Sequence, residues 1–211
     1  MGGMLGVEGL HNLEAQATNL QVLFDAGYRM AGLTHFFDNA LAGSMHGLEK
    51  GGLTDFGRGI VREMEALGMA IDIAHLSPKA VDEVLAMATR PIVVSHGGVK
   101  ALCNANRNLT DTQIRGVAAT GGVIGIGYWP GAICNTHPDA VAAAMLHVVD
   151  LVGIDHVGLG SDYDGAVQVA FDTSALALIT GALQRQGLSD REIAQVMGGN
   201  VVRVLSETLP D

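Results

Sequence analysis

Three histidines and two carboxylates in this 211-residue chain stand at the ends of short apolar segments. They are Glu8, His35, His75, His96 and Asp162. Neutral imidazoles and carboxylates are the usual protein ligands of zinc and similar ions, and they also act as acids and bases in hydrolysis. One histidine in such a place is more often a hydrogen-bonded core residue. The repetition of the pattern favours a metal or hydrolytic site.

Each of these side chains ends a segment that we expect to be a β-strand. The expected strands are residues 4–8, 30–35, 70–75, 92–96, 122–128 and 157–162. Amphipathic stretches separate them, and this alternation predicts an α/β fold with a parallel sheet. The carboxyl ends of parallel strands meet at one edge, where barrels and open sheets carry their chemistry. The five candidates are therefore expected at that edge.

Several helix boundaries are also predicted by local sequence. Ser77, which is followed by proline, has the pattern of a helix start with apolar positions recurring at helical spacing behind it. The segments 110–113 and 189–192 have the spacing of a capping box. Gly68 and Gly198 stand where two helices should end.

The composition limits the class of protein. No linker, low-complexity run or charge block divides the chain, so we expect one domain over residues 1–211. A formal net charge of −10 offers no basic surface for phosphates and argues against a nucleic-acid partner. No stretch reaches the roughly 20 apolar residues of a membrane span, and no secretory leader is visible. These features predict no membrane segment and a cytoplasmic location.

The chain has two cysteines, Cys103 and Cys134. They lack the close spacing of a zinc ribbon or a redox motif. We therefore expect free thiols in a reducing compartment rather than a disulfide.

Other polar and glycine-rich segments are weaker candidates. Tyr128 and Trp129 end an expected strand, and they either line a substrate pocket or pack in the core. The segment GSDYDG at 160–165 lacks the remaining oxygen ligands of a calcium loop. The glycines of GGVIGIG at 121–127 fall inside an apolar strand, which favours close backbone packing over dinucleotide binding. The other histidines are expected to be solvated or locally bonded: His11, His46, His137, His147 and His156.

Seven motifs follow one another along nearly the whole chain. They are VEG at 7–9, GLTHFFDNALAG at 32–43, GLTDFG at 52–57, GMAIDIAHLS at 68–77, VVSH at 93–96, NRNLTD at 106–111 and GLGSDYDG at 158–165. In order and spacing they resemble the renal (membrane) dipeptidase family of zinc peptidases. The resemblance implies a (β/α) TIM-barrel-like metallohydrolase that binds two zinc ions and cleaves dipeptides, with tolerance for a D-residue on the C-terminal side.

The resemblance also implies which residues hold metal. Carried over by position, Glu8 would be the carboxylate that bridges both zinc ions, and His75 and His96 would be the imidazole ligands of one of them. These three ligands leave one coordination position open, which is the arrangement of a catalytic zinc.

Three further residues are assigned to substrate and proton transfer by the same resemblance. His35 would contact the substrate and the tetrahedral intermediate, Arg107 would bind the free carboxylate of the substrate, and Asp162 would be the acid/base. A guanidinium suits the binding of the substrate carboxylate, because its fork donates two parallel hydrogen bonds to a carboxylate. Without the resemblance, a surface ion pair is the simpler interpretation of Arg107.

One part of the family pattern has no counterpart here. The family carries a His-x-Asp on its first barrel strand, which supplies further ligands of the second zinc. The sole His-x-Asp of this sequence, His137–Asp139, lies in a proline-containing loop and is expected to cap the next helix. The resemblance therefore predicts about six of eight β/α units, with one zinc site largely retained.

Two alternatives to a zinc dipeptidase follow from this difference. The first is a catalytically inactive, truncated barrel that acts as a metal-binding or interaction protein. The second is an amidohydrolase that acts on a related amide. As partners we expect a dipeptide substrate and no nucleic acid, and the resemblance is compatible with a homodimer.

Overall fold

The structure of the protein is a computed structural model that describes residues 2–210. Contacts within the chain divide it into two compact units. The first contains the chain up to Val93, residues 120–122 and the chain from Val204, and the second contains Val94–Ala119 and Val123–Arg203. The expectation of a single domain stays a prediction, and each unit is described by itself.

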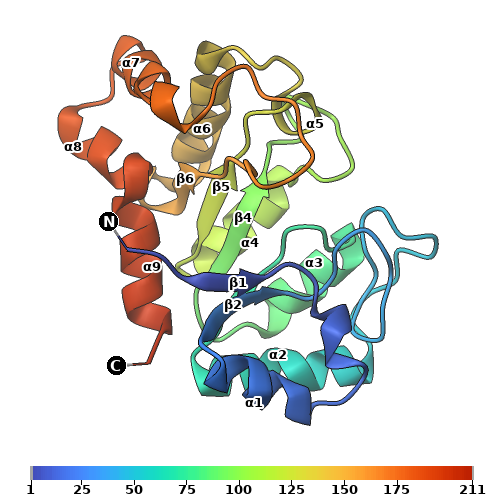
Figure 1. Ribbon diagram of the computed structural model, residues 1–211. Coiled ribbons are helices and arrows are strands. Elements are labelled where there is room, and N and C mark those ends of the chain that lie inside the picture. The colour runs from blue at the N-terminus through green and yellow to red at the C-terminus, as the bar shows by residue number, and fades with distance from the viewer. Residues whose placement is uncertain (1, 211) are drawn as a thin grey trace. The chain divides into compact units, whose positions relative to one another are not determined.

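The first unit contains a parallel sheet with helices packed against it (Figure 1). Its strands are β1 (Leu5–Val7), β2 (Tyr28–Gly32), β3 (Ala70–Asp72) and the beginning of β4 (Ile92–Gly97), which neighbour one another in chain order. The helices are a 3-10 turn (Leu10–Leu13), α1 (Thr18–Asp25), α2 (Asp55–Leu67) and α3 (Pro78–Met87).

Local sequence explains where the helices of this unit begin and end. The Ser77 side chain accepts a hydrogen bond from the backbone N–H of Ala80, with Pro78 in the first turn, as predicted. Helix α2 starts on Thr54 in the same manner and ends on Gly68, whose φ of 73° suits glycine. The apolar faces of both helices are buried, which confirms the helical periodicity.

The second unit contains the remainder of β4, β5 (Val123–Ile126) and β6 (Val157–Leu159), again in chain order. The β5–β6 pair is parallel. Its helices are α4 (Asp111–Ala119), α5 (Pro130–Ile133), α6 (Pro138–Val152), α7 (Ala177–Arg185), α8 (Asp190–Ala194) and the start of α9 (Asn200–Thr208). Helices α6 and α7 lie side by side (Figure 1). The prediction of an α/β fold with parallel strands is confirmed.

Both predicted capping boxes are present in the second unit. Thr110 and Gln113 exchange backbone-to-side-chain hydrogen bonds at the start of α4, and Ser189 and Glu192 do so at the start of α8. After α8 the chain forms a π-helical turn at Gln195–Gly199, and within it Gly198 has a non-helical φ of 155°. Helix α9 follows this turn directly. The prediction of a helix end at Gly198 is therefore right about the break and misses α9.

Two glycines allow the strands of the second unit to approach closely. A Cβ on Gly125 would overlap the carbonyl oxygen of Ser95, and a Cβ on Gly160 would overlap the backbone of Gly125. Close backbone packing, the role predicted for the glycines of the segment 121–127, is thus confirmed at Gly125.

The two cysteines form a disulfide, so the prediction of free thiols was wrong. Cys103 lies in the loop after β4, Cys134 directly follows α5, and their Cα atoms are 5.5 Å apart. The two cysteines are 31 positions apart in sequence, and the segment between them folds into α4, β5 and α5, which brings the two together. A sequence spacing of that size carries no pairing signal, which is why the sequence did not reveal the bond. Disulfides are typical of oxidising compartments, and the cytoplasmic location stays a prediction.

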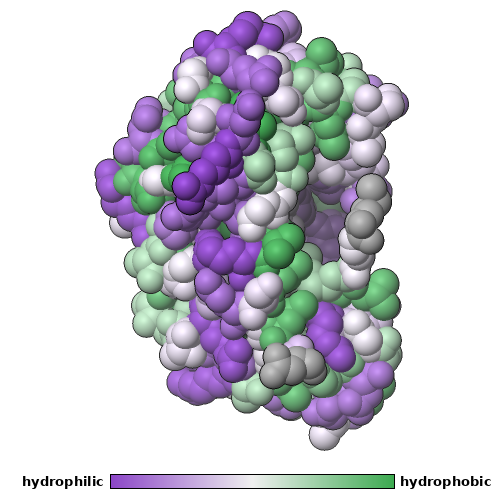
Figure 2. Space-filling view, turned by 90° about the vertical axis from the view of Figure 1, so that its left-hand side faces the viewer, coloured by the Kyte–Doolittle hydropathy of each residue, from purple (hydrophilic) through white to green (hydrophobic). Residues whose placement is uncertain are grey.

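The described residues include no helix that has both the length and the apolar character needed to cross a membrane. Figure 2 shows one face of the molecule, on which hydrophobic and hydrophilic residues alternate in small patches. Large apolar side chains are exposed at several places, among them Phe37 and Leu48 in the loop between β2 and α2.

Candidate metal centre and substrate residues

Glu8, His35 and His75 lie together in the first unit. The Nε2 atom of His75 is 2.9 Å from Oε1 of Glu8, and the Nε2 atom of His35 is 3.6 Å from Oε2 of the same carboxylate. The two imidazole rings meet edge to face with their centroids 4.6 Å apart. Ligand atoms of all three residues lie within 4.8 Å of one another, so this part of the predicted site is assembled as expected.

The backbone places these side chains just beyond the strands. Glu8 follows β1 directly, whereas His35 and His75 lie three residues after the ends of β2 and β3. His75 has a φ of 67°, a left-handed conformation that costs a non-glycine residue energy. Its carbonyl oxygen accepts hydrogen bonds from Thr34 and from the backbone of Met45, which hold the strained turn in place.

His46 is a member of this neighbourhood that sequence reasoning set aside. Its ring stacks on Phe36 with centroids 5.0 Å apart, and it lies 6.0 Å from the ring of His75. Phe36 in turn contacts His35 edge to face. The expectation that His46 is only solvated or locally bonded misses these contacts. The motif GLTHFFDNALAG signalled His35, but nothing in its spacing indicated His46, which lies 11 residues further on.

The loop that carries Phe36 and His46 is organised around Asp38. Its carboxylate accepts hydrogen bonds from the backbone N–H groups of Ser44 and Glu49, each at 2.8 Å. The hydrogen bond from Glu49, the largest of several influences, holds the pKa of Asp38 below its ordinary value. Gly47 leaves room for the carboxylate, because a Cβ there would overlap it.

Asp38→Asn is expected to lower the midpoint of thermal unfolding at pH 7 by about 2–4 °C, because the amide replaces a charged acceptor of two backbone hydrogen bonds. A carboxylate with a lowered pKa contributes stability above its unfolded pKa and loses it as the pH falls through the folded pKa. The midpoints of parent and variant should therefore converge in acid. Melting curves recorded between pH 7 and pH 2.5 test this, and a constant difference across that range would contradict the role of Asp38.

A second cluster lies in the second unit and contains His96, Asp162 and Arg107. Oδ2 of Asp162 is 3.9 Å from Nε2 of His96, and the other ring nitrogen, Nδ1, is 2.8 Å from the hydroxyl of Ser95. A guanidinium nitrogen of Arg107 donates to the carbonyl oxygen of His96 at 3.3 Å. The imidazole of His96 is buried, and its two ring nitrogens face Ser95 and Asp162, which together set the orientation of the ring.

Asp162 repeats the backbone feature of His75. It lies three residues after β6 with a φ of 55°, and its carbonyl oxygen accepts a hydrogen bond from the backbone N–H of Gly165. Aspartate is among the non-glycine residues that adopt this conformation most readily, and strained residues of this kind cluster at functional sites. The segment 160–165 thus forms a tight turn that presents a carboxylate.

The structure distinguishes the two aromatic residues that the sequence left open. Trp129 lies against Arg107, whose Cζ is 4.5 Å from the centre of the indole, and its ring is 5.8 Å from that of His96. Tyr128 is fully buried and packs against Tyr163 and Phe171. Burial raises the pKa of both tyrosines. Tyr128 therefore belongs to the core, and Trp129 belongs to the candidate site.

Two of the remaining histidines are locally bonded, as predicted. His137 caps α6, where its Nδ1 accepts from the backbone N–H of Asp139, and the Asp139 carboxylate pairs with Arg185. His147 lies 2.9 Å from Asp111. The His-x-Asp segment of this chain thus forms the N-terminal cap of α6.

The donor set of the first unit suits a zinc ion. A buried imidazole and a carboxylate already point their ligand atoms at each other, and a second imidazole lies beside them. Nitrogen and oxygen donors of these types are zinc's usual ligands after cysteine. His96 in the second unit offers the same type of nitrogen, also buried. The roles of the individual residues stay predictions.

Comparison with known proteins identifies the family. A family model described as membrane dipeptidase (peptidase family M19) matches residues 1–209. The chain belongs to the membrane dipeptidase family. An uncharacterised dipeptidase of Schizosaccharomyces pombe is 34% identical over 99% of the chain and 53% of its own length. Dipeptidase tcpJ of Claviceps purpurea is 34% identical over 97% of the chain and 50% of its length. The chain spans about half the length of these relatives.

A solved structure of a metallopeptidase shows the same fold. The metallopeptidase of Rhodobacter sphaeroides, solved with a phosphinate mimic of the dipeptide L-Ala-D-Ala, is 26% identical. It superimposes with a TM-score of 0.90 over 98% of this chain and 63% of that one. The likeness confirms the fold class expected of a member of this family.

Proposed function

We propose that the protein is a zinc metallodipeptidase, which hydrolyses the peptide bond of dipeptides. Membership of the membrane dipeptidase family supports the reaction type. The observation that carries the proposal is the contact at 2.9 Å between the buried imidazole of His75 and the carboxylate of Glu8. A buried imidazole that faces a carboxylate, with His35 beside both, is what a zinc site requires of the chain.

Glu8, His75 and His96 are the residues that would hold zinc. Bound there, the ion would lower the pKa of a water molecule and polarise the scissile carbonyl, so that no serine or cysteine nucleophile is needed. The hydrogen bond between Ser95 and Nδ1 of His96 leaves the Nε2 atom of His96 as its donor to a metal. His35, which lies beside Glu8, would donate a hydrogen bond to the oxygen on which negative charge develops.

Asp162 and Arg107 would perform the remaining tasks. Asp162 would accept the proton of the attacking water and return it to the leaving amine, which amide hydrolysis requires. Arg107 would bind the free carboxylate of the substrate through its guanidinium fork and so select dipeptides by length. A homodimer and a cytoplasmic location stay predictions.

The proposal is tested by elemental analysis of the purified protein together with hydrolysis of Gly-D-Ala in the same sample. We expect about one zinc ion or more per chain, turnover that a chelator abolishes, and recovery when zinc is added. Protein that carries zinc and does not hydrolyse dipeptides would support a metal-binding role instead.

Arg107→Ala distinguishes a dipeptidase from an amidohydrolase that acts on a related amide. Loss of a charged, two-pronged contact should reduce kcat/KM for Gly-D-Ala about 100-fold, while hydrolysis of the C-terminal amide of the same dipeptide should not change. Arg185→Ala is the matched control, because this exposed arginine of α7 pairs with Asp139 at the surface. Equal losses on both substrates would contradict the carboxylate contact.

A further inference from the structure

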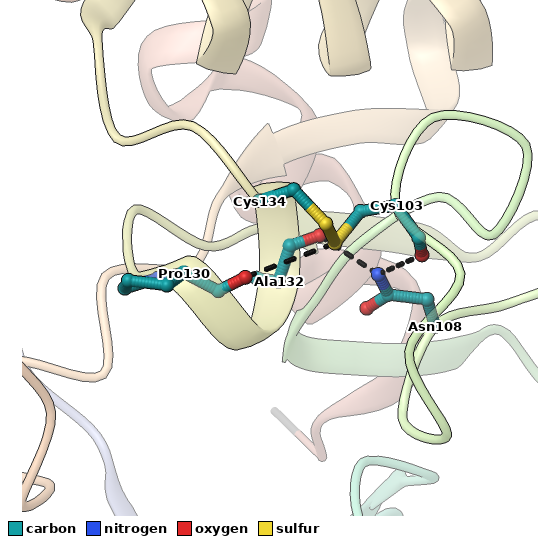
Figure 3. Close-up of a disulfide and its surroundings, with 5 residues drawn as sticks. All are labelled: Cys103, Asn108, Pro130, Ala132 and Cys134. Atoms are coloured by element: carbon teal, nitrogen blue, oxygen red, sulfur yellow. Dashed lines mark hydrogen bonds between the residues drawn. A yellow bond between two sulfur atoms is a disulfide. The ribbon is translucent and has the colours of Figure 1, made fainter.

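The Cys103–Cys134 disulfide joins two segments of the second unit that both contact the candidate site. One is the loop 98–110, which carries Arg107, and the other is α5, which begins directly after Trp129. Figure 3 shows the bond linking this loop to the end of the short helix. The link is covalent, so it limits how far Arg107 and Trp129 can separate.

Asn108 provides a second, independent link between the same segments. Its buried side-chain amide donates to the carbonyl oxygens of Cys103 and Ala132, each at 2.8 Å (Figure 3). Gly98 allows this approach, because a Cβ there would overlap the carbonyl oxygen of Ala132. Asn108 is the residue next to Arg107, so the backbone that carries the guanidinium is fixed directly.

Trp129 is also held in place by its surroundings. The backbone carbonyl oxygen of Trp129 accepts hydrogen bonds from the backbone N–H groups of Ala132 and Ile133 in the first turn of α5, and the indole side chain is buried. A Cβ on Gly127 would overlap the ring, so the neighbouring chain is shaped to leave room for it. The guanidinium of Arg107 lies over this ring, and such a contact is worth about 0.5–2 kcal/mol.

From these contacts we infer that Trp129 is a positioning residue for Arg107, and that the disulfide and Asn108 keep the Arg107 and Trp129 side chains in contact. The inference rests on the proposed function, since it assumes that Arg107 binds the substrate carboxylate. Arg107 has a long side chain with several rotatable bonds, and ordering it in advance reduces the entropy lost when substrate binds. Stacking on Trp129 and a hydrogen bond to the carbonyl oxygen of His96 provide that order.

The kinetic test compares Trp129→Leu, Trp129→Phe and the double variant Cys103→Ser/Cys134→Ser with the parent. For Gly-D-Ala we expect Trp129→Leu and the double variant to raise KM about tenfold with kcat within about twofold, and Trp129→Phe to restore most of the affinity because it keeps an aromatic face. KM for the C-terminal amide should not change. Equal effects on both substrates, or an unchanged KM for Gly-D-Ala, would overturn the inference while leaving the dipeptidase proposal intact.

A second measurement does not depend on activity. Trp129 is the sole tryptophan of the chain, so tryptophan emission reports on this ring alone. Arg107→Ala and the double cysteine variant should each raise the acrylamide quenching constant about twofold, whereas the control Arg185→Ala should leave it unchanged. If the parent does not hydrolyse dipeptides, the proposed function fails, and the quenching measurement alone then tests whether Trp129 and Arg107 are held together. Unchanged quenching in both variants would then overturn the inference.

Discussion

His75→Ala is expected to remove bound zinc and to abolish dipeptide hydrolysis. The imidazole is buried, and its Nε2 atom already lies 2.9 Å from the Glu8 carboxylate, so the variant loses a nitrogen donor that the fold holds in place. Loss of one protein ligand from a set of three should weaken zinc binding roughly 100-fold or more. Elemental analysis after gel filtration measures the metal, and turnover of Gly-D-Ala is followed in the same fractions.

Two further variants separate metal loss from misfolding. Alanine at position 75 must adopt a φ of 67°, whereas asparagine tolerates this conformation, so His75→Asn tests the ligand with less backbone strain. His147→Ala removes a histidine that pairs with Asp111 and should keep both zinc and activity. If both variants at position 75 retain full zinc content, His75 is not a ligand.

Asp162→Asn is expected to reduce kcat by a factor of about 10²–10⁴ while zinc content stays unchanged. The amide keeps the size of the side chain and can neither accept nor return the proton that amide hydrolysis transfers. The backbone should tolerate the change, because asparagine adopts the left-handed φ of 55° as readily as aspartate does. Kinetics with Gly-D-Ala and zinc analysis of the same preparation provide the measurement.

The control for this variant is Asp164→Asn, two residues away in the same turn and exposed to solvent. It changes the charge of the segment 160–165 by the same amount and should leave kcat unaltered. Asp162 lies 3.9 Å from Nε2 of His96, so a metal-ligand role is the competing explanation. Loss of zinc from Asp162→Asn would favour that explanation over proton transfer.

The alternation of apolar runs and amphipathic stretches was enough to predict an α/β fold with parallel strands, because burial sets that pattern. It was not enough to predict where each strand ends. Ile73 and Ala74 continue the apolar run of β3, yet the strand ends at Asp72 and the chain turns at His75. Hydrophobicity reports burial, and it does not report a backbone dihedral angle.

The candidate site was predictable where a motif carried the signal, and not where only the tertiary fold creates the contact. Glu8, His35 and His75 were expected together and lie together. The Cys103–Cys134 bond and the contact between Trp129 and Arg107 were both missed, because the partners are 22 residues or more apart in sequence with no spacing rule to join them.

The left-handed backbone at His75 and Asp162 has an evolutionary consequence. Glycine would fit both positions with less strain, by about 1 kcal/mol or more at each. Selection for folding alone would therefore tolerate glycine at both positions. A positive φ also occurs at Glu14, Ala15, Lys50 and Cys134, so the strain by itself is no mark of function. His75 and Asp162 differ from those four because each lies beside another candidate ligand, Glu8 and His96 respectively. Whether relatives keep histidine and aspartate at these two positions would therefore show what selection has acted on.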